Sequence, residues 1–222
     1  MRGRDFLSAM QTCGSDALPI VTLISLLTGL TMAFVGGVQL EKFAAQIYMA
    51  DLVGLAMVRE MGALMTAIVM AGRTGAAFAA ELGNMKVSEE IDSLRTLGVS
   101  PFDFLVMPRV LALFIMIPLL TLYADVVGII GGMMVGTLVV GFSVDHYLAQ
   151  TEMAIDSMWE VYSGMLKSLA FGAIIGLVGC YKGLRCGASS SAVGQAVYLS
   201  RGDRHHLGGG GRRPLRSGFQ LP

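Results

Sequence analysis

The chain has 222 residues, of which 54% are hydrophobic and only 14% are charged. A soluble domain usually carries about 25% charged residues, so this composition excludes an ordinary soluble protein and indicates an integral membrane protein. The 16 basic and 16 acidic residues balance, which removes the electrostatic basis for binding nucleic acid. The 3 cysteines form no CxxC pair, so we expect neither a disulfide framework nor a metal site.

Four apolar runs are long enough to cross a bilayer, which takes about 20 residues of helix. We therefore predict an all-α polytopic membrane protein, with a polar N-terminal segment at residues 1–16 and one membrane domain at residues 17–196. The third run is too long for one straight crossing, and Pro118 and the Gly131–Gly132 pair offer positions for a kink. The spans are expected at about residues 17–39, 52–80, 104–140 and 159–181.

The distribution of Lys and Arg predicts the orientation of these spans. The link between the first and second spans and the link between the third and fourth spans hold Lys42 together with several acidic residues. We therefore expect the N-terminus and the polar segment after the second span to lie in the cytoplasm. Along a path that alternates sides, the following basic residues share the cytoplasmic side: Arg2, Arg4, Lys86, Arg95, Arg109, Lys182 and Arg185.

Small residues recur every four positions in three of the runs, a spacing that lets membrane helices approach closely. Such rows indicate helix packing in a bundle rather than a binding site. The rows are Ala71, Gly75, Ala79 and Gly83; Gly128, Gly132 and Gly136; and Ser168, Gly172 and Gly176.

Five charged residues, Arg59, Glu60, Arg73, Asp125 and Lys167, fall inside or near the ends of spans. A charge in lipid is costly, so such a group usually faces a partner or a hydrated cavity. Arg73 lies near a span end, from which its side chain can extend to the membrane surface. Arg59 and Glu60 point about 100° apart on a helix, so they cannot simply pair with each other. Arg59, Glu60 and Lys167 either form structural ion pairs or take part in function.

A short polar helix is predicted at about residues 88–97, with Ser88 as its N-cap and Arg95 in its last turn. Gly98 and Pro101 end it, while Ile91, Leu94 and Leu97 form one apolar edge. It is either an amphipathic connector on the membrane or a coupling helix that docks on a cytoplasmic motor. The chain has no GxxxxGK[ST] motif and no catalytic set, so a motor would be another protein.

The C-terminal residues 197–222 have no apolar period and do not predict a span. With permitted codon choices, the same bases read one position later encode an apolar run. We therefore expect an aberrant, disordered tail, produced by a frameshift after about Ala196 that removes a fifth span.

Three stretches resemble the MlaE (YrbE) permeases of Mce-associated bacterial lipid ABC transporters. They are REMGALMTAIVMAGRTGAAFAAELGNMKVSEEIDSLRTLGVSPFDFLVMPRVLA, PLLTLYADVVGIIGG and KSLAFGAIIGLVGCYKG. The resemblance covers about residues 17–196. The family has a further N-terminal interface helix and a fifth span with an acidic residue, neither of which this sequence predicts.

The resemblance implies a homodimeric multi-pass permease of the bacterial inner membrane that moves phospholipid or a related lipid between the inner and outer membranes. It implies a cytoplasmic ABC ATPase that binds the ATP, a periplasmic Mce-domain lipid-binding protein and a small STAS-type subunit as partners. It places Arg59, Glu60 and Lys167 at the lipid cavity. It assigns ATPase coupling to Glu81, Lys86, Glu89, Glu90, Asp92, Leu94 and Arg95.

The residues alone leave other functions open. Arg59, Glu60 and Lys167 would also suit an ion or proton relay in a motor-independent transporter or channel. A non-transporting scaffold subunit and a non-functional truncated product are further alternatives. Neither the lipid nor the direction of transport follows from the sequence.

Overall fold

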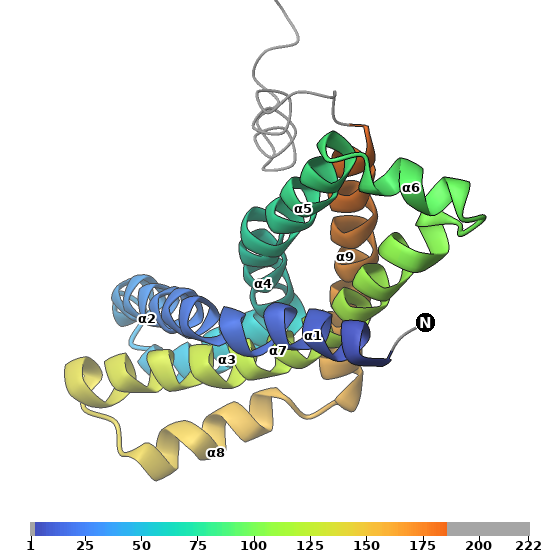
Figure 1. Ribbon diagram of the computed structural model, residues 1–222. Helices are drawn as coiled ribbons and strands as arrows, with labels where there is room; N and C mark the ends of the chain where they lie inside the picture. The colour runs from blue at the N-terminus through green and yellow to red at the C-terminus, as the bar shows by residue number, and fades with distance from the viewer. Residues whose placement is uncertain (1–2, 186–222) are drawn as a thin grey trace, which may run out of the picture.

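The computed structural model describes residues 3–185, which are helical throughout apart from short links and contain no strand (Figure 1). Four helical stretches in this part of the chain are long and apolar enough to cross a membrane: Leu7–Glu41, Gln46–Val87, Phe102–Val140 and Met158–Leu184. The predicted all-α polytopic fold is therefore confirmed. The predicted tail and the lost fifth span lie outside the described residues.

The α-helices are α1 Gly3–Cys13, α2 Leu18–Glu41, α3 Met49–Ala56, α4 Gly62–Met70, α5 Ala76–Val87, α6 Glu90–Thr96, α7 Met107–Val135, α8 Val144–Ala154 and α9 Met158–Leu184. Two 3₁₀ turns, η1 Ser15–Ala17 and η2 Gln46–Tyr48, precede α2 and α3. Four π-helical segments interrupt the long helices: η3 Met57–Met61, η4 Ala71–Gly75, η5 Phe102–Val106 and η6 Gly136–Val140.

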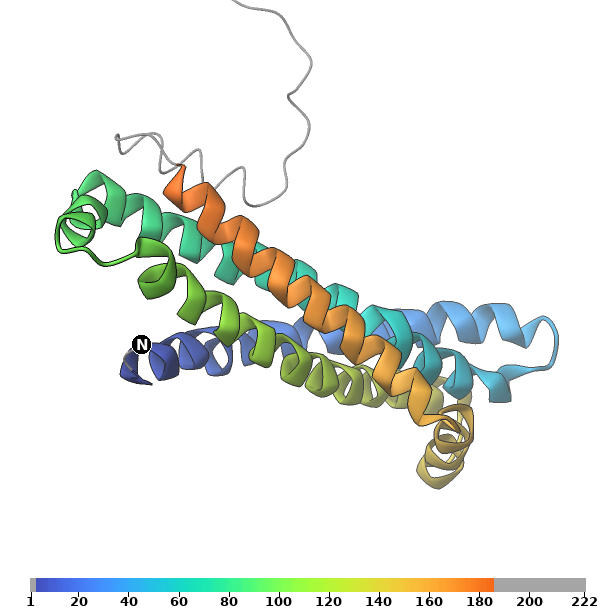
Figure 2. The same ribbon diagram turned by 90° about the vertical axis from the view of Figure 1, so that its right-hand side faces the viewer.

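Different helices lie at the two ends of the bundle (Figure 2). At one end, here called the α6 end, lie α6, the N-terminal part of α1 and the C-terminal part of α9. At the opposite end, the α8 end, lie α8 and the link between α2 and α3. The side of the membrane that each end faces stays a prediction, with the α6 end in the cytoplasm.

The second helical stretch is longer than the predicted span at both ends. It begins within the segment expected to link the first and second spans, because Met49, Ala50 and Val53 are buried in a core cluster with Tyr147. It continues to Val87 because polar residues beyond the apolar run find partners on α7 and α9, as described below. Hydropathy alone records neither kind of contact.

Close helix packing at the small-residue rows is confirmed. A Cβ atom on Gly179 of α9 would lie 2.8 Å from the carbonyl oxygen of Gly75, and one on Gly172 would lie 3.1 Å from that of Leu113. A Cβ atom on Gly29 of α2 would overlap the main chain of Gly128 on α7. Helix α7 is therefore the centre of the bundle, with α2 and α9 packed directly on its backbone.

The predicted N-cap of the polar helix is wrong. Ser88 ends α5 instead, and its hydroxyl donates to the carbonyl oxygen of Asn84 at 3.0 Å. Glu89 then adopts a left-handed conformation with φ of 60°, and α6 starts at Glu90. Because this reversal uses two residues, α6 spans Glu90–Thr96 rather than 88–97.

The predicted outer link between the third and fourth spans contains a helix that the sequence did not indicate. Ser143 caps α8 by accepting a hydrogen bond from the main-chain N–H of His146 at 3.3 Å. Tyr147 anchors the helix with 1% of its surface exposed, and this burial raises the pKa of its phenol to about 12. Helix α8 thus packs against α3 and α7 rather than crossing open solvent.

Candidate functional site

The second span changes its helical geometry where its first intramembrane charges occur. Arg59 and Glu60 lie in the π-helical segment η3, between α3 and α4. Segments of this kind are rare and are found often at functional sites. The extra residue in the turn alters which side chains of the span face α9.

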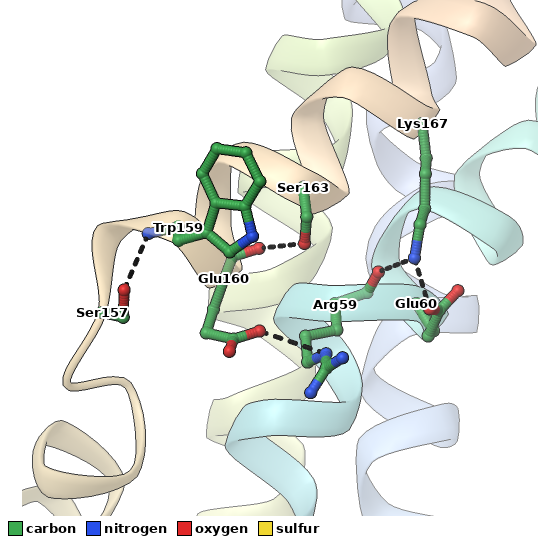
Figure 3. Close-up of polar contacts among 7 residues, drawn as sticks. All are labelled: Arg59, Glu60, Ser157, Trp159, Glu160, Ser163 and Lys167. Atoms are coloured by element: carbon green, nitrogen blue, oxygen red, sulfur yellow. Dashed lines mark hydrogen bonds and ion pairs between the residues drawn. The ribbon is translucent and has the colours of Figure 1, made fainter.

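Arg59 and Glu60 each pair with a residue of α9 rather than with each other, as their divergence predicts (Figure 3). The Arg59 guanidinium lies 3.1 Å from Oε2 of Glu160. Lys167 forms an ion pair with Glu60 and donates a second hydrogen bond to the carbonyl oxygen of Arg59 at 3.2 Å. Two ion pairs between η3 and α9 are therefore linked through the main chain of Arg59 into one network.

The spacing of residues on α9 explains this network. Glu160 and Lys167 are seven residues apart, which is two helical turns and places them on the same face. Between them, a Cβ atom on Gly164 would overlap the carbonyl oxygen of Val58. Gly164 thus allows α9 to approach η3 closely enough for both ion pairs. Glu160 and Gly164 were not among the predicted site residues. The seven-residue spacing from Lys167 could have identified Glu160, and the row of small residues that includes Ser168 continues back four positions to Gly164.

A cavity of about 580 Å³ adjoins the network. Its walls are mostly apolar side chains of α2 and α3, and Arg59, Glu60 and Asp51 supply its charged groups. Asp51 accepts a hydrogen bond from the Gln150 side chain of α8 at 3.0 Å. The cavity therefore combines an apolar surface with charges of both signs. It is lined by Leu40, Tyr48, Asp51, Leu52, Leu55, Ala56, Arg59 and Glu60.

Arg73 has partners within the protein and does more than extend to the membrane surface. It lies in the second π-helical segment of the span, η4. Its Nη1 donates to the carbonyl oxygen of Thr12 at 3.2 Å, and its Nη2 lies 3.8 Å from Asp16. Arg73 thus connects the second span to the last turn of α1 and to the link that follows it.

The predicted coupling residues fall into two groups. Glu81 pairs with Arg109 of α7 at 3.1 Å, and Lys86 donates to the carbonyl oxygen of Leu184 at 2.8 Å. These two residues fix the end of α5 to α7 and α9.

The remaining coupling residues are on or beside α6, where contacts are local. Arg95 pairs with Asp92 at 3.2 Å, and Glu90 accepts from Ser88 at 3.1 Å. Leu94 packs on the core next to Ile91, which is buried, whereas Glu89 is exposed. The charged surface of α6 therefore remains available to another molecule.

Within residues 3–185, no cluster of His, Cys, Asp and Glu side chains has the arrangement to hold a metal ion. Four apolar spans, ion pairs between the second and fourth of them, and a cavity beside these ion pairs define a polytopic α-helical membrane protein with a candidate transport site.

The chain belongs to the MlaE permease family, whose profile, described as Permease MlaE, matches residues 6–200. A probable ABC transporter permease protein of Rickettsia typhi is 37% identical over 184 residues, covering 83% of this chain and 71% of that relative. The chloroplastic protein trigalactosyldiacylglycerol 1 of Arabidopsis thaliana is 34% identical over 87% of this chain and 55% of its own length. The chain is accordingly a multi-pass transport permease.

A third relative has a name that states a substrate. The intermembrane phospholipid transport system permease protein MlaE of Haemophilus influenzae is 30% identical over 188 residues, covering 85% of this chain and 72% of that relative.

Proposed function

We propose that this chain is the membrane-spanning permease subunit of an ATP-driven ABC transporter that moves phospholipid between the inner and outer bacterial membranes. The name of the Haemophilus influenzae relative, an intermembrane phospholipid transport permease, carries this proposal. In the proposed assembly the permease is a homodimer in the inner membrane, with a cytoplasmic ABC ATPase, a periplasmic Mce-domain protein and a small STAS-type subunit. ATP is bound by the ATPase and not by this chain.

The cavity beside η3 supports a lipid substrate. Its volume of about 580 Å³ lies within the usual range of ligand pockets, about 300–1,000 Å³. Leu52, Leu55 and Ala56 offer apolar contacts to an acyl chain, while Arg59 offers a guanidinium suited to a phosphate. For a head group to bind, Arg59 would exchange its contact with Glu160 for one with the phosphate.

The proposed coupling starts at α6. Nucleotide-driven closure of the ATPase would move α6, and Ile91 and Leu94 would pass this motion to the core beneath them. The second span continues from α5 to η3, so it connects α6 with the charged end of the cavity. Substituting Glu90 or scrambling the exposed positions of α6 should then stop transport while leaving the bundle folded.

Co-purification in mild detergent tests the assignment. A tagged permease should retain an ATPase subunit and bound phospholipid, both detected by native mass spectrometry. A variant with the exposed positions of α6 scrambled should lose the ATPase and keep the lipid. Isolation of the intact permease without either component, or transport that persists with α6 scrambled, would contradict the proposal. Transport without a motor would instead favour an ion-coupled transporter that uses Arg59, Glu60 and Lys167.

A further inference from the structure

Of the five intramembrane charged residues, Asp125 is the one with no charged partner among residues 3–185. It lies on α7, with 6% of its surface exposed. Within the described residues its Oδ1 atom has no hydrogen-bond partner, and no ion pair includes it. Buried polar groups are normally hydrogen-bonded, so this carboxyl requires a different explanation from Glu60.

The carboxyl lies against the main chain of the second span at the point where η3 ends. A Cβ atom on Gly62, the first residue of α4, would overlap Oδ1 of Asp125. About one turn further along α7, a Cβ atom on Gly128 would overlap the side chain of Met57, the first residue of η3. Asp125 and Gly128 therefore hold α7 against both ends of the segment that carries Arg59 and Glu60.

The charged groups on the elements around Asp125 are already engaged elsewhere. On η3, Arg59 pairs with Glu160 and Glu60 pairs with Lys167 of α9. Helix α4 carries no charged residue, and α2 carries none before Glu41 at its end. Among residues 3–185, no cation is thus placed to neutralise a carboxylate at position 125.

Two tyrosines in the described part of the chain also approach this part of α7. Tyr123 shares a hydrogen bond of 2.7 Å with Thr22 on α2. Tyr147 of α8 reaches α7 at Gly132, where a Cβ atom would lie 2.7 Å from its hydroxyl oxygen. A phenol never carries a positive charge, so neither side chain can compensate a negative charge on Asp125.

We propose that Asp125 is a proton-binding site, whose neutral carboxyl holds α7 against Gly62 and whose ionisation loosens this contact and shifts the ion pairs of η3. An isolated carboxylate in the bilayer interior is strongly unfavourable, whereas a neutral carboxyl loses far less on burial. Ionisation transfers the proton to water and leaves a charge against the main chain of α4. That charge is relieved only when water enters or when a cation of the network, Arg59 or Lys167, turns toward it. Asp125 is a positioning residue for the site, since it acts through η3.

Infrared spectroscopy of the full-length permease in lipid nanodiscs tests the protonation directly. At neutral pH the wild type should show the carbonyl stretching band of a protonated carboxyl, and the nearly isosteric Asp125→Asn variant should lack it. Glu60→Gln is the matched control, because a paired carboxylate contributes no such band. A second variant, Asp125→Val, covers the case in which the amide disturbs packing. A wild type without the band, or a band that survives both substitutions at position 125, would overturn the proposal.

The coupling to η3 has its own readout in Trp159, the only tryptophan of the chain. Trp159 precedes Glu160, whose carboxylate holds Arg59 (Figure 3). Raising the pH should produce a transition in Trp159 fluorescence in the wild type that is absent in Asp125→Asn. Glu160→Gln should alter the emission at every pH and leave the infrared band in place. A transition that persists in Asp125→Asn would show that another group controls η3 and would refute the coupling.

Discussion

The second span contains two π-helical segments, η3 and η4, and each carries one arginine. Arg59 of η3 reaches a carboxylate on α9, in a network with Glu60 and Lys167 beside a cavity. Arg73 of η4 reaches a main-chain carbonyl of the N-terminal segment and the more distant Asp16. The same local geometry therefore brings an arginine to two different kinds of partner. At η3 the partners are charges next to a cavity, whereas at η4 the arginine fastens a peripheral helix.

Both segments pack closely on α9, and only part of their packing differs. The contact between η3 and α9 depends on Gly164, where a Cβ atom would overlap the main chain. Within η4, a Cβ atom on Gly72 would meet nothing within 4 Å. Segment η4 also contacts α9 closely, since a Cβ atom on Gly179 would lie 2.8 Å from the carbonyl oxygen of Gly75, but it has an open side at Gly72.

The largest effect on stability is expected from disrupting the close contact between α9 and η3 at Gly164. Gly164→Leu should push α9 away from η3 and destabilise the protein by about 3 kcal/mol or more, at the upper end of overpacking costs. Gly72→Leu is the matched control and should cost less than about 1 kcal/mol, because the space beside it is open. Thermal unfolding in detergent measures both. Equal melting temperatures for the two variants would show that the space beside Gly164 and the space beside Gly72 do not differ as described.

The next effect concerns the ion pair of Glu60 and Lys167. Lys167→Met should destabilise the protein by about 1 kcal/mol, because it leaves the half-exposed Glu60 without its partner. Combining it with Glu60→Gln should recover most of that loss, since the uncompensated charge is then gone. A double-mutant cycle on thermal stability measures the coupling. Strictly additive effects would mean that the two residues do not depend on each other.

A smaller effect is expected at η4. Arg73→Met should cost about 0.5–1 kcal/mol, because the ion pair with Asp16 is long and partly exposed. Hydrogen exchange of residues 3–17 should accelerate in this variant, since α1 loses its connection to the second span. Arg59→Met should leave exchange in that segment unchanged. Faster exchange there in both variants would contradict the separate roles of the two arginines.

The smallest effect on stability is expected at α6. Leu97 is 76% exposed, so Leu97→Ser should change the free energy of unfolding by no more than about 0.5 kcal/mol. If α6 docks on the ATPase, the same variant should reduce co-purification of that subunit. Ile91→Ser is the contrasting variant, because Ile91 is 3% exposed and its loss should destabilise the bundle. Undiminished ATPase binding by the Leu97 variant would argue against an apolar docking edge.

The sequence predicted those features that depend on composition and period. Apolar runs predicted four spans, and the rows of small residues predicted close packing, because both follow from local chemistry. The divergence of Arg59 and Glu60 also followed from helix geometry alone. Their actual partners did not, since they depend on the rotation of α9 relative to η3.

Other features were missed because they depend on tertiary contacts. The π-helical segments have no clear sequence signal, and they decide which way Arg59 and Arg73 point. Ser88 has the chemistry of an N-cap, yet its hydroxyl bonds back to Asn84 and the chain reverses at Glu89. Helix α8 forms in a segment that reads as a polar link because Tyr147 finds a buried position against α7.

ATP-dependent lipid transfer tests the central proposal most directly. The permease and its co-purified ATPase would be reconstituted into vesicles that contain a fluorescent phospholipid, with acceptor vesicles and the Mce-domain protein present. We predict transfer that requires ATP hydrolysis and that falls at least about tenfold when α6 is scrambled, with the bundle still folded. Transfer at the same rate without ATP, or ATP hydrolysis with no lipid movement in the complete assembly, would contradict the proposed function.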